Sequence, residues 1–253
     1  MKHLPSLALF VSLSCNAMAS DQGTAPVADF SSKAAVQQAL NEYWPEPLLN
    51  AFSAYRCGYD NIGKRTIAGM LEKTPETVNG SPIAYGFLLG YSDHLGSLKI
   101  DENSSSVGCK AIASRNPDAL KTLPDDRIDS NRAIDQMIKD TGIIDSLGQS
   151  RINNLLISTS NIQSRLGVKL NASVLLSACN DPEASKLMPT AIDVINGSGL
   201  VGTPDKQKIK DALDVWFGYS QGIYWHAISL VNQYEPKQKT EFCHNLKMNA
   251  QDL

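Results

Sequence analysis

The chain has 253 residues, and its 23 lysines and arginines stand against 26 acidic residues, giving a formal net charge of −3 at pH 7. This length is enough for one large domain or for two small ones, each with its own core. The basic residues are scattered and form no stripe along the sequence. Because binding to a phosphate backbone requires clustered Lys and Arg, we expect no nucleic-acid partner.

The N-terminus has the features of a secretory signal peptide. A short basic segment at Lys2 precedes residues 4–14, which are apolar apart from three serines. That run is too short to cross a bilayer as a permanent helix. An Ala-Met-Ala stretch ending at Ala19 then supplies the small-x-small pattern that a signal peptidase cleaves. We therefore expect residues 1–19 to be removed and the mature protein to be periplasmic or secreted.

Cys15 lies inside this signal peptide and raises the alternative of a lipoprotein anchor. We rank it lower, because the preceding Ser12-Leu13-Ser14 puts serine where such sites usually have leucine. Residues 20–32 are small and polar, so we expect a flexible leader there. No later segment reaches the roughly 18 uninterrupted apolar residues that a spanning helix needs, and no transmembrane segment is expected.

Beyond the leader, two segments of the chain repeat one order of landmarks. Each has a cysteine, then a helical pattern containing Gly-Tyr-Ser (at Gly90 and at Gly218), then a closing cysteine. The spacings differ and the identity is low, so chance resemblance between two amphipathic helices is the alternative. We expect an internal duplication, with helical unit 1 over 33–125, connecting helices over 126–168 and helical unit 2 over 169–253.

The duplication predicts how the cysteines pair. Loss of Cys15 leaves four cysteines, which allow three pairings. An exported protein seldom keeps four free thiols, so disulfides are expected. If each unit is stapled separately, the bonds are Cys57–Cys109 and Cys179–Cys243.

Helix signals dominate the rest of the sequence. Residues 83–95 and 204–231 have apolar side chains near helical spacing, and Ser81 and Thr203 are expected to cap these two helices. Connecting helices are expected over 130–140 and 151–166, the latter stopping at Gly167. No stretch alternates like a strand, so we predict an all-α bundle of two disulfide-stapled units. Four glycines in the two long helices should mark close approach of another backbone: Gly86, Gly90, Gly218 and Gly222.

One glycine-rich segment matches a nucleotide-binding motif. Residues 197–202 match Gly-x-Gly-x-x-Gly, which in dinucleotide-binding folds lets the backbone approach a pyrophosphate. Here the expected helix starts after the motif rather than inside it. No acidic residue stands about twenty residues further on, where Gln221 lies. We therefore expect a loop between two helices and no cofactor.

Polar residues offer no recognisable catalytic or metal motif. Asp93-His94 with a distant serine could imitate a hydrolase triad, but the Gly-x-Ser-x-Gly sequence at 218–222 falls inside an expected helix and not at the strand-to-helix turn of a nucleophile elbow. No His-x-x-x-His spacing exists, and the single Glu-x-x-His, at Glu241 and His244, stands alone, so no helical metal site is expected. Asp93, His94 and His226 remain a weak candidate polar site that would have to be assembled in three dimensions.

Aromatic side chains crowd the second long helix on more than one of its faces. Most should be core, but one or two exposed members would form a partner-binding patch, because Trp and Tyr are favoured interface anchors. The candidates are Trp216, Tyr219, Tyr224 and Trp225.

The second unit resembles a known family. Leu176-Ser177-Ala178-Cys179, then Trp216-Phe217-Gly218-Tyr219-Ser220, then Cys243 are similar to the pattern of small helical periplasmic immunity proteins. Those proteins neutralise the peptidoglycan amidases of type VI secretion. The resemblance implies a protein partner, with a cell-wall enzyme as one candidate. Acid-stress periplasmic chaperones look similar in outline, so a stress role and an enzyme with an unrecognised site stay as alternatives.

Overall fold

A computed structural model describes residues 30–97, 102–122, 130–250 and 253, and within these residues the chain forms helices and no strand. The predicted all-α class is confirmed. The signal peptide, Cys15 and residues 20–29 of the leader lie outside the described residues. The helices are α2 (Phe30–Tyr43), α3 (Pro45–Arg56), α4 (Asp60–Lys73), α5 (Glu76–Asn79), α6 (Pro82–Ser97), α7 (Glu102–Arg115), α8 (Ser130–Asp140), α9 (Ile143–Leu147), α10 (Gln149–Ala178), α11 (Ala184–Leu187), α12 (Ala191–Ser198), α13 (Lys206–Asn232) and α14 (Pro236–Ala250).

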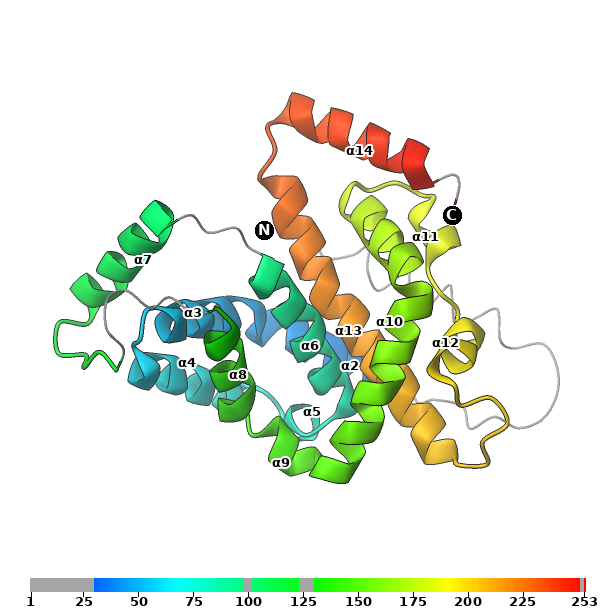
Figure 1. Cartoon of the computed structure of the whole chain (residues 1–253), viewed down its shortest axis with the longest axis horizontal. Coiled ribbons are helices and arrows are strands. Elements are labelled where there is room, and N and C mark those ends of the chain that lie inside the picture. The colour runs from blue at the N-terminus through cyan, green and yellow to red at the C-terminus, as the bar shows by residue number, and fades with distance from the viewer. Residues whose placement is uncertain (1–29, 98–101, 123–129, 251–252) are drawn as a thin grey trace.

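Helices α6 and α13 form the centre of the molecule, with α2 to α5, α8 and α9 gathered on one side and α10 to α12 on the other (Figure 1). Both helices were expected from the sequence. Ser81 caps α6, because its hydroxyl accepts the Ala84 N–H at 3.1 Å. The cap of α13 is Asp205 and not Thr203 as predicted, since the Asp205 carboxylate accepts two backbone N–H groups at 3.1 Å and the helix begins after it.

The backbones of α6 and α13 touch at the four glycines. A Cβ atom built on Gly86 would come far closer than 3.0 Å to the Val215 carbonyl oxygen, and one on Gly218 would meet the Ile83 carbonyl oxygen in the same way. Gly90 and Gly222 repeat this contact one turn further along. Each glycine therefore faces the carbonyl three residues before its counterpart, so the two helices run parallel where they touch. The predicted close approach is confirmed.

A buried polar stripe fixes α2 on α13. Lys33 and Gln37 lie one turn apart on α2, and they bond Asp214 at 2.6 Å and Gln221 at 2.9 Å. One turn further, Asn41 accepts the Trp225 indole N–H at 3.0 Å. Because a buried polar group without a partner is costly, this ladder sets the position of α2 along α13. It also places residues 30–32, the last of the predicted leader, within or beside a helix and not in a flexible segment.

Helix α10 differs from the prediction. It runs without a break from Gln149 to Ala178, through Gly167, where a stop was expected. Glycine costs a helix interior only about 1 kcal/mol relative to alanine. The burial of Ile162 and Leu170 on either side outweighs this cost. The boundary between connecting helices and second unit, predicted at 168/169, therefore falls inside a continuous helix.

Two disulfides tie peripheral helices to the body. Cys57, just after α3, is bonded to Cys109 on α7, and Cys179, just after α10, is bonded to Cys243 on α14. These are the pairs that the repeated order of cysteines predicts. Their sequence separations are 52 and 64 residues. In the chain-entropy account, closing loops of this size stabilises the fold by about 4 kcal/mol each, as an upper figure.

The glycine contact makes a prediction about packing. Gly218→Ala would drive a methyl group into the α6 backbone, which cannot yield as a side-chain tip can, so we expect a loss of about 3 kcal/mol in the free energy of unfolding. Gly167→Ala is the matched control in the other long helix, because no atom lies within 4 Å of its Cβ position. It should be neutral or stabilise by up to about 1 kcal/mol. Urea unfolding of both variants measures this, and equal losses would contradict it.

The disulfide pairing makes a second prediction. Proteolysis of the oxidised protein followed by mass spectrometry should find peptides that join Cys57 to Cys109 and Cys179 to Cys243. A peptide joining Cys57 to Cys179 would contradict both the pairing and the two separately stapled units.

Candidate functional site

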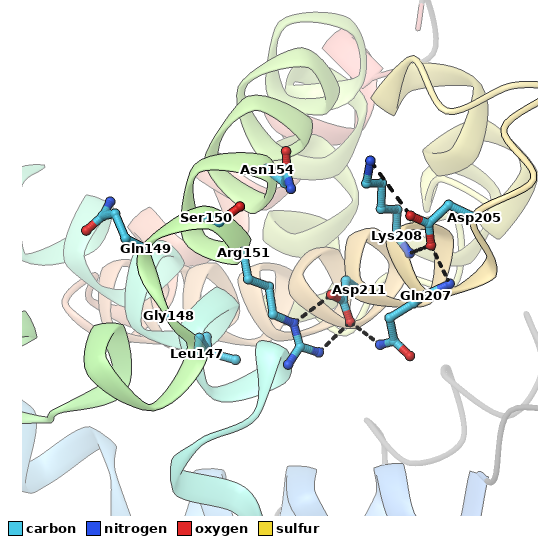
Figure 2. Close-up of a pocket in the computed structure, with 10 residues that line it drawn as sticks. All are labelled: Leu147, Gly148, Gln149, Ser150, Arg151, Asn154, Asp205, Gln207, Lys208 and Asp211. Carbon is cyan, nitrogen blue, oxygen red and sulfur yellow. Dashed lines mark hydrogen bonds and ion pairs between the residues drawn. The ribbon is translucent and has the colours of Figure 1, made fainter.

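A groove of about 810 Å³ opens where the first turns of α10 and α13 meet (Figure 2). Both helices begin at this end. Short polar side chains of α10 therefore lie opposite long polar side chains of α13. The lining includes Gln149, Ser150, Asn154, Gln207 and Lys208. This is a wide recess at the surface, lined mostly by polar residue types, and not an enclosed chamber.

The floor of the groove is a closed ion pair. Arg151 donates from Nε and Nη2 to the two oxygens of Asp211, each at 2.7 Å, and Gln207 donates to the same carboxylate at 2.7 Å. Asp211 is buried, whereas the Arg151 side chain is 39 % exposed. The hydrogen bonds to Asp211 raise the pKa of the Arg151 guanidinium above its usual value. A carboxylate that already accepts three hydrogen bonds suits a structural pair better than a general base.

The second acid of the groove is also occupied. Asp205 caps the N-terminus of α13, and its other oxygen lies 3.7 Å from the ammonium group of Lys208. The long side chain of Lys208 is about half exposed and reaches over the mouth of the groove (Figure 2). The groove therefore offers hydrogen-bond donors to a bound molecule, because the carboxylate oxygens in it already have partners.

A smaller recess of about 270 Å³ continues the groove toward α12, and Ile157 and Leu200 line it. Beyond it, α10 and α12 are joined by side chains that bond backbone carbonyls. Asn161 donates to the Ser198 carbonyl at 3.4 Å, and Arg165 donates to the Asn196 carbonyl at 3.1 Å. The numbering rises on α10 and falls on α12, so the two helices run antiparallel along this seam.

Exposed apolar side chains flank the same seam. Ile157 and Val168, eleven residues apart, share one face of α10, because eleven residues make about three turns. They are 61 % and 68 % exposed, and Ile192 on α12 is 62 % exposed. We name the surface formed by Ile157, Arg165, Val168, Lys169 and Ile192 the α10–α12 face. Val201, 66 % exposed, follows Leu200 at its lower end.

The predicted aromatic patch is divided by the structure. Trp216 and Tyr219 are each 6 % exposed and stack on one another with ring centroids 5.8 Å apart, so these two belong to the core and not to a surface. Tyr224 and Trp225 are half-buried. The Trp225 indole is held by Asn41. Trp216 and Tyr219 therefore do not form an exposed patch, because the seam between α10 and α13 covers both rings.

The members of the predicted polar site lie on two helices, Asp93 and His94 on α6 and His226 on α13. Asp93 accepts the Tyr219 hydroxyl at 2.6 Å and lies 3.5 Å from the Gln163 amide nitrogen. Burial, and then this bond to Asp93, raise the pKa of Tyr219. His226 stands seven residues further along α13, about 10 Å along the helix axis. His94 is in α6, but its side chain lies outside the described residues.

The glycine motif at 197–202 begins in the last two residues of helix α12 and does not follow a strand. Gly197, within α12, packs on Leu166 of α10, while Gly199 and Gly202 have positive φ angles of +77° and +74°. These residues form a turn between α12 and α13, and no helix begins inside the motif as pyrophosphate binding requires. The predicted loop between two helices is confirmed.

Within the described residues, no three His, Cys, Asp or Glu side chains gather as a metal site would need. None of the described helices is both long and apolar enough to span a bilayer. Comparison with known proteins gives no match to this chain, whether with family models, curated proteins or solved structures. The groove and the α10–α12 face are the surface features on which the proposed function rests.

His226 predicts an acid sensitivity of the fold. Burial lowers the pKa of its half-buried imidazole below the ordinary 6.5, so the folded state binds fewer protons than the unfolded chain just below that pH. Stability should therefore fall as the pH drops below 6.5. Bonded carboxylates such as Asp193, whose pKa is lowered by Thr190, respond only below pH 3.8.

Urea unfolding between pH 7.5 and pH 5 measures the effect. His226→Gln should flatten the stability profile in this range, whereas His244→Gln, at an exposed histidine of α14, serves as the matched control. An unchanged profile in the His226 variant would show that another group is responsible.

Proposed function

We propose that this chain is an exported helical protein that binds and neutralises a protein partner, in the manner of the periplasmic immunity proteins that its second unit resembles. One observation supports this most. Three β-branched apolar side chains of the α10–α12 face are more than 60 % exposed, and one of them, Ile157, lines the smaller recess that continues the groove. Single exposed apolar residues are ordinary, but several along one seam are typical of interaction sites.

The scaffold under this face is suited to binding. Helix α10 packs along α13, and its C-terminal end is tied through Cys179 to α14. Lys247 of α14 adds an ion pair with Asp181, at 3.1 Å, just beyond that disulfide. A surface held in place before association loses little conformational entropy on binding, which favours affinity. A tethered helical surface of this kind fits an inhibitor or immunity protein.

Polar chemistry favours binding over catalysis. The two acids that line the groove, and Asp93 of α6, are engaged by neighbours: Asp211 by Arg151, Asp205 by the backbone that it caps, and Asp93 by Tyr219. A general base needs an acceptor within reach of a substrate proton. Binding a protein partner needs an open surface and exposed hydrogen-bond donors. The groove offers both, with Lys208 among its donors.

We further propose that the two disulfide-stapled units arose by duplication. Both first cysteines follow a helix that ends in the same way, with Gly58 and Asn180 in the left-handed conformation at φ +79° and +59°. In both, the next residue but one bonds back to the helix: Tyr59 to the Ala54 carbonyl and Asp181 to the Leu176 carbonyl. This is the Schellman closure of a helix.

The reciprocal glycine contacts join the two helices that contain the repeated Gly-Tyr-Ser sequences, although not at the positions that the repeat aligns. The contacts pair Gly86 with Gly218 and Gly90 with Gly222. Alignment of the two Gly-Tyr-Ser sequences pairs Gly90 with Gly218 instead, which is a shift of one helical turn. An experimental structure in which the segments around these landmarks fail to superpose in order would contradict the duplication.

A rescue assay tests the proposed function. Cells that export a panel of type VI peptidoglycan amidases should lyse, and co-export of the full chain should protect them from at least one member. Val168→Asp, which places a charge on the α10–α12 face, should reduce protection and weaken binding of the purified pair about tenfold or more, because a contact at the centre of an interface would acquire an unpaired charge.

The matched control is Leu120→Asp, at an apolar residue that is 76 % exposed on the other side of the molecule. It should protect as well as the unmodified chain. Failure to protect against every amidase, together with no binding to any other exported protein, would contradict the proposal.

A further inference from the structure

Helix α10 has an unusual charge. It is 30 residues long and contains Arg151, Arg165 and Lys169 but no aspartate or glutamate. The chain has 26 acids in 253 residues, so an average stretch of this length would contain about three. A protein of net charge −3 therefore presents a long helix whose only charges are positive.

The acidic side chains near α10 already have hydrogen-bond partners. Asp211 neutralises Arg151 in the floor of the groove. Asp193, on α12, accepts both the backbone N–H and the hydroxyl of Thr190, at 2.9 and 2.7 Å. Lys169 lies near enough to contribute to the lowered pKa of Asp193, but that carboxylate is already held by its cap. The face consequently has more donors than available acceptors.

The cations and the apolar side chains alternate on one face. Ile157, Arg165 and Val168 fall within about 80° of each other around α10, at 100° per residue. Lys169 continues the stripe on α10 and lies near Asp193 of α12, the residue that follows the exposed Ile192. A partner that covers the stripe must bury apolar surface and accept hydrogen bonds in the same few turns.

We propose that the occupant of the α10–α12 face is an acidic, partly apolar surface of the protein partner, with Asp or Glu carboxylates over Arg165 and Lys169 and apolar side chains over Val168 and Ile192. This inference rests on the proposed function. Opposite charge across an interface raises the rate of association and fixes its register. The recesses beside the stripe accommodate protein side chains, which is why a protein surface is favoured over an anionic membrane.

Photocrosslinking in the host cell tests where the partner lies. p-Benzoylphenylalanine replaces Val168 or Ile192 in the full exported chain, and it replaces Leu120 or Leu49 in control variants at exposed apolar residues of other elements. Irradiation should attach one protein, identified by mass spectrometry, at 168 and 192 and not at the control positions. The captured protein should have a cluster of Asp and Glu at its crosslinked surface.

Charge reversal tests the chemistry with that captured protein. Arg165→Glu/Lys169→Glu should weaken its binding about tenfold or more at 0.1 M salt, and less at 1 M, where the screening length falls from about 10 Å to about 3 Å. Lys64→Glu/Arg65→Glu is the matched control on the exposed face of α4, with the same change of charge and no expected loss. Circular dichroism confirms that both variants are folded.

Each other outcome overturns the inference. Capture at 120 or 49 alone would leave the partner-binding function standing and refute the assigned face. Capture at 168 with no loss on charge reversal would refute the acidic character of the partner. Sedimentation with vesicles of phosphatidylglycerol and phosphatidylethanolamine, lost on charge reversal and without protein capture, would assign the face to lipid. No protein captured at any position would refute the proposed function and this inference with it.

Discussion

The backbone contact between α6 and α13 determines how the rest of the molecule is arranged. Four glycines allow the helices to approach until carbonyl oxygens occupy the places of side chains. Because α3 and α8 pack with α6 in one core while α10 and α12 pack with α13 in another, this contact joins the two halves. It also leaves the outer surface of α13 to the polar side chains that hold α2. Each of these two helices has two glycines whose Cβ positions would lie within 3.0 Å of the other helix's backbone.

The proposed binding surface follows from the same arrangement. Helix α10 lies along α13, so one of its sides is buried by Ile162, Leu170 and Val174, while side chains on its other side are exposed from Asn153 to Asn171. A long helix with one free side, stapled at its C-terminal end by Cys179, can present cations and apolar side chains in fixed positions. The closely packed centre holds α10 in a fixed position on the outside of the molecule. A surface fixed in this way favours tight binding, which is the property that a protein inhibitor requires.

Sequence reasoning succeeded where one residue type has one physical meaning. Glycines four apart in two long helices indicated backbone contact, and four cysteines in a repeated order gave the observed pairs. It failed where tertiary packing decides. Gly167 does not end α10, because core contacts on either side compensate for its low propensity. Trp216 is buried by α10, which no local pattern shows. The exposure of Val168 was missed as well, although its position on the polar side of α10, in register with Asn161 and Arg165, could have revealed it.

Native-state hydrogen exchange tests the central role of the α6–α13 contact most directly. If the contact holds the two halves together, the amides of Phe87, Tyr91, Tyr219 and Ile223 should exchange only through global unfolding, with the free energy that urea unfolding gives. The amides of the tethered helices α7 and α14 should exchange through smaller local openings. Exchange of the α6 and α13 amides at a lower free energy than those of α7 or α14 would contradict the account, because the centre would then open before its periphery.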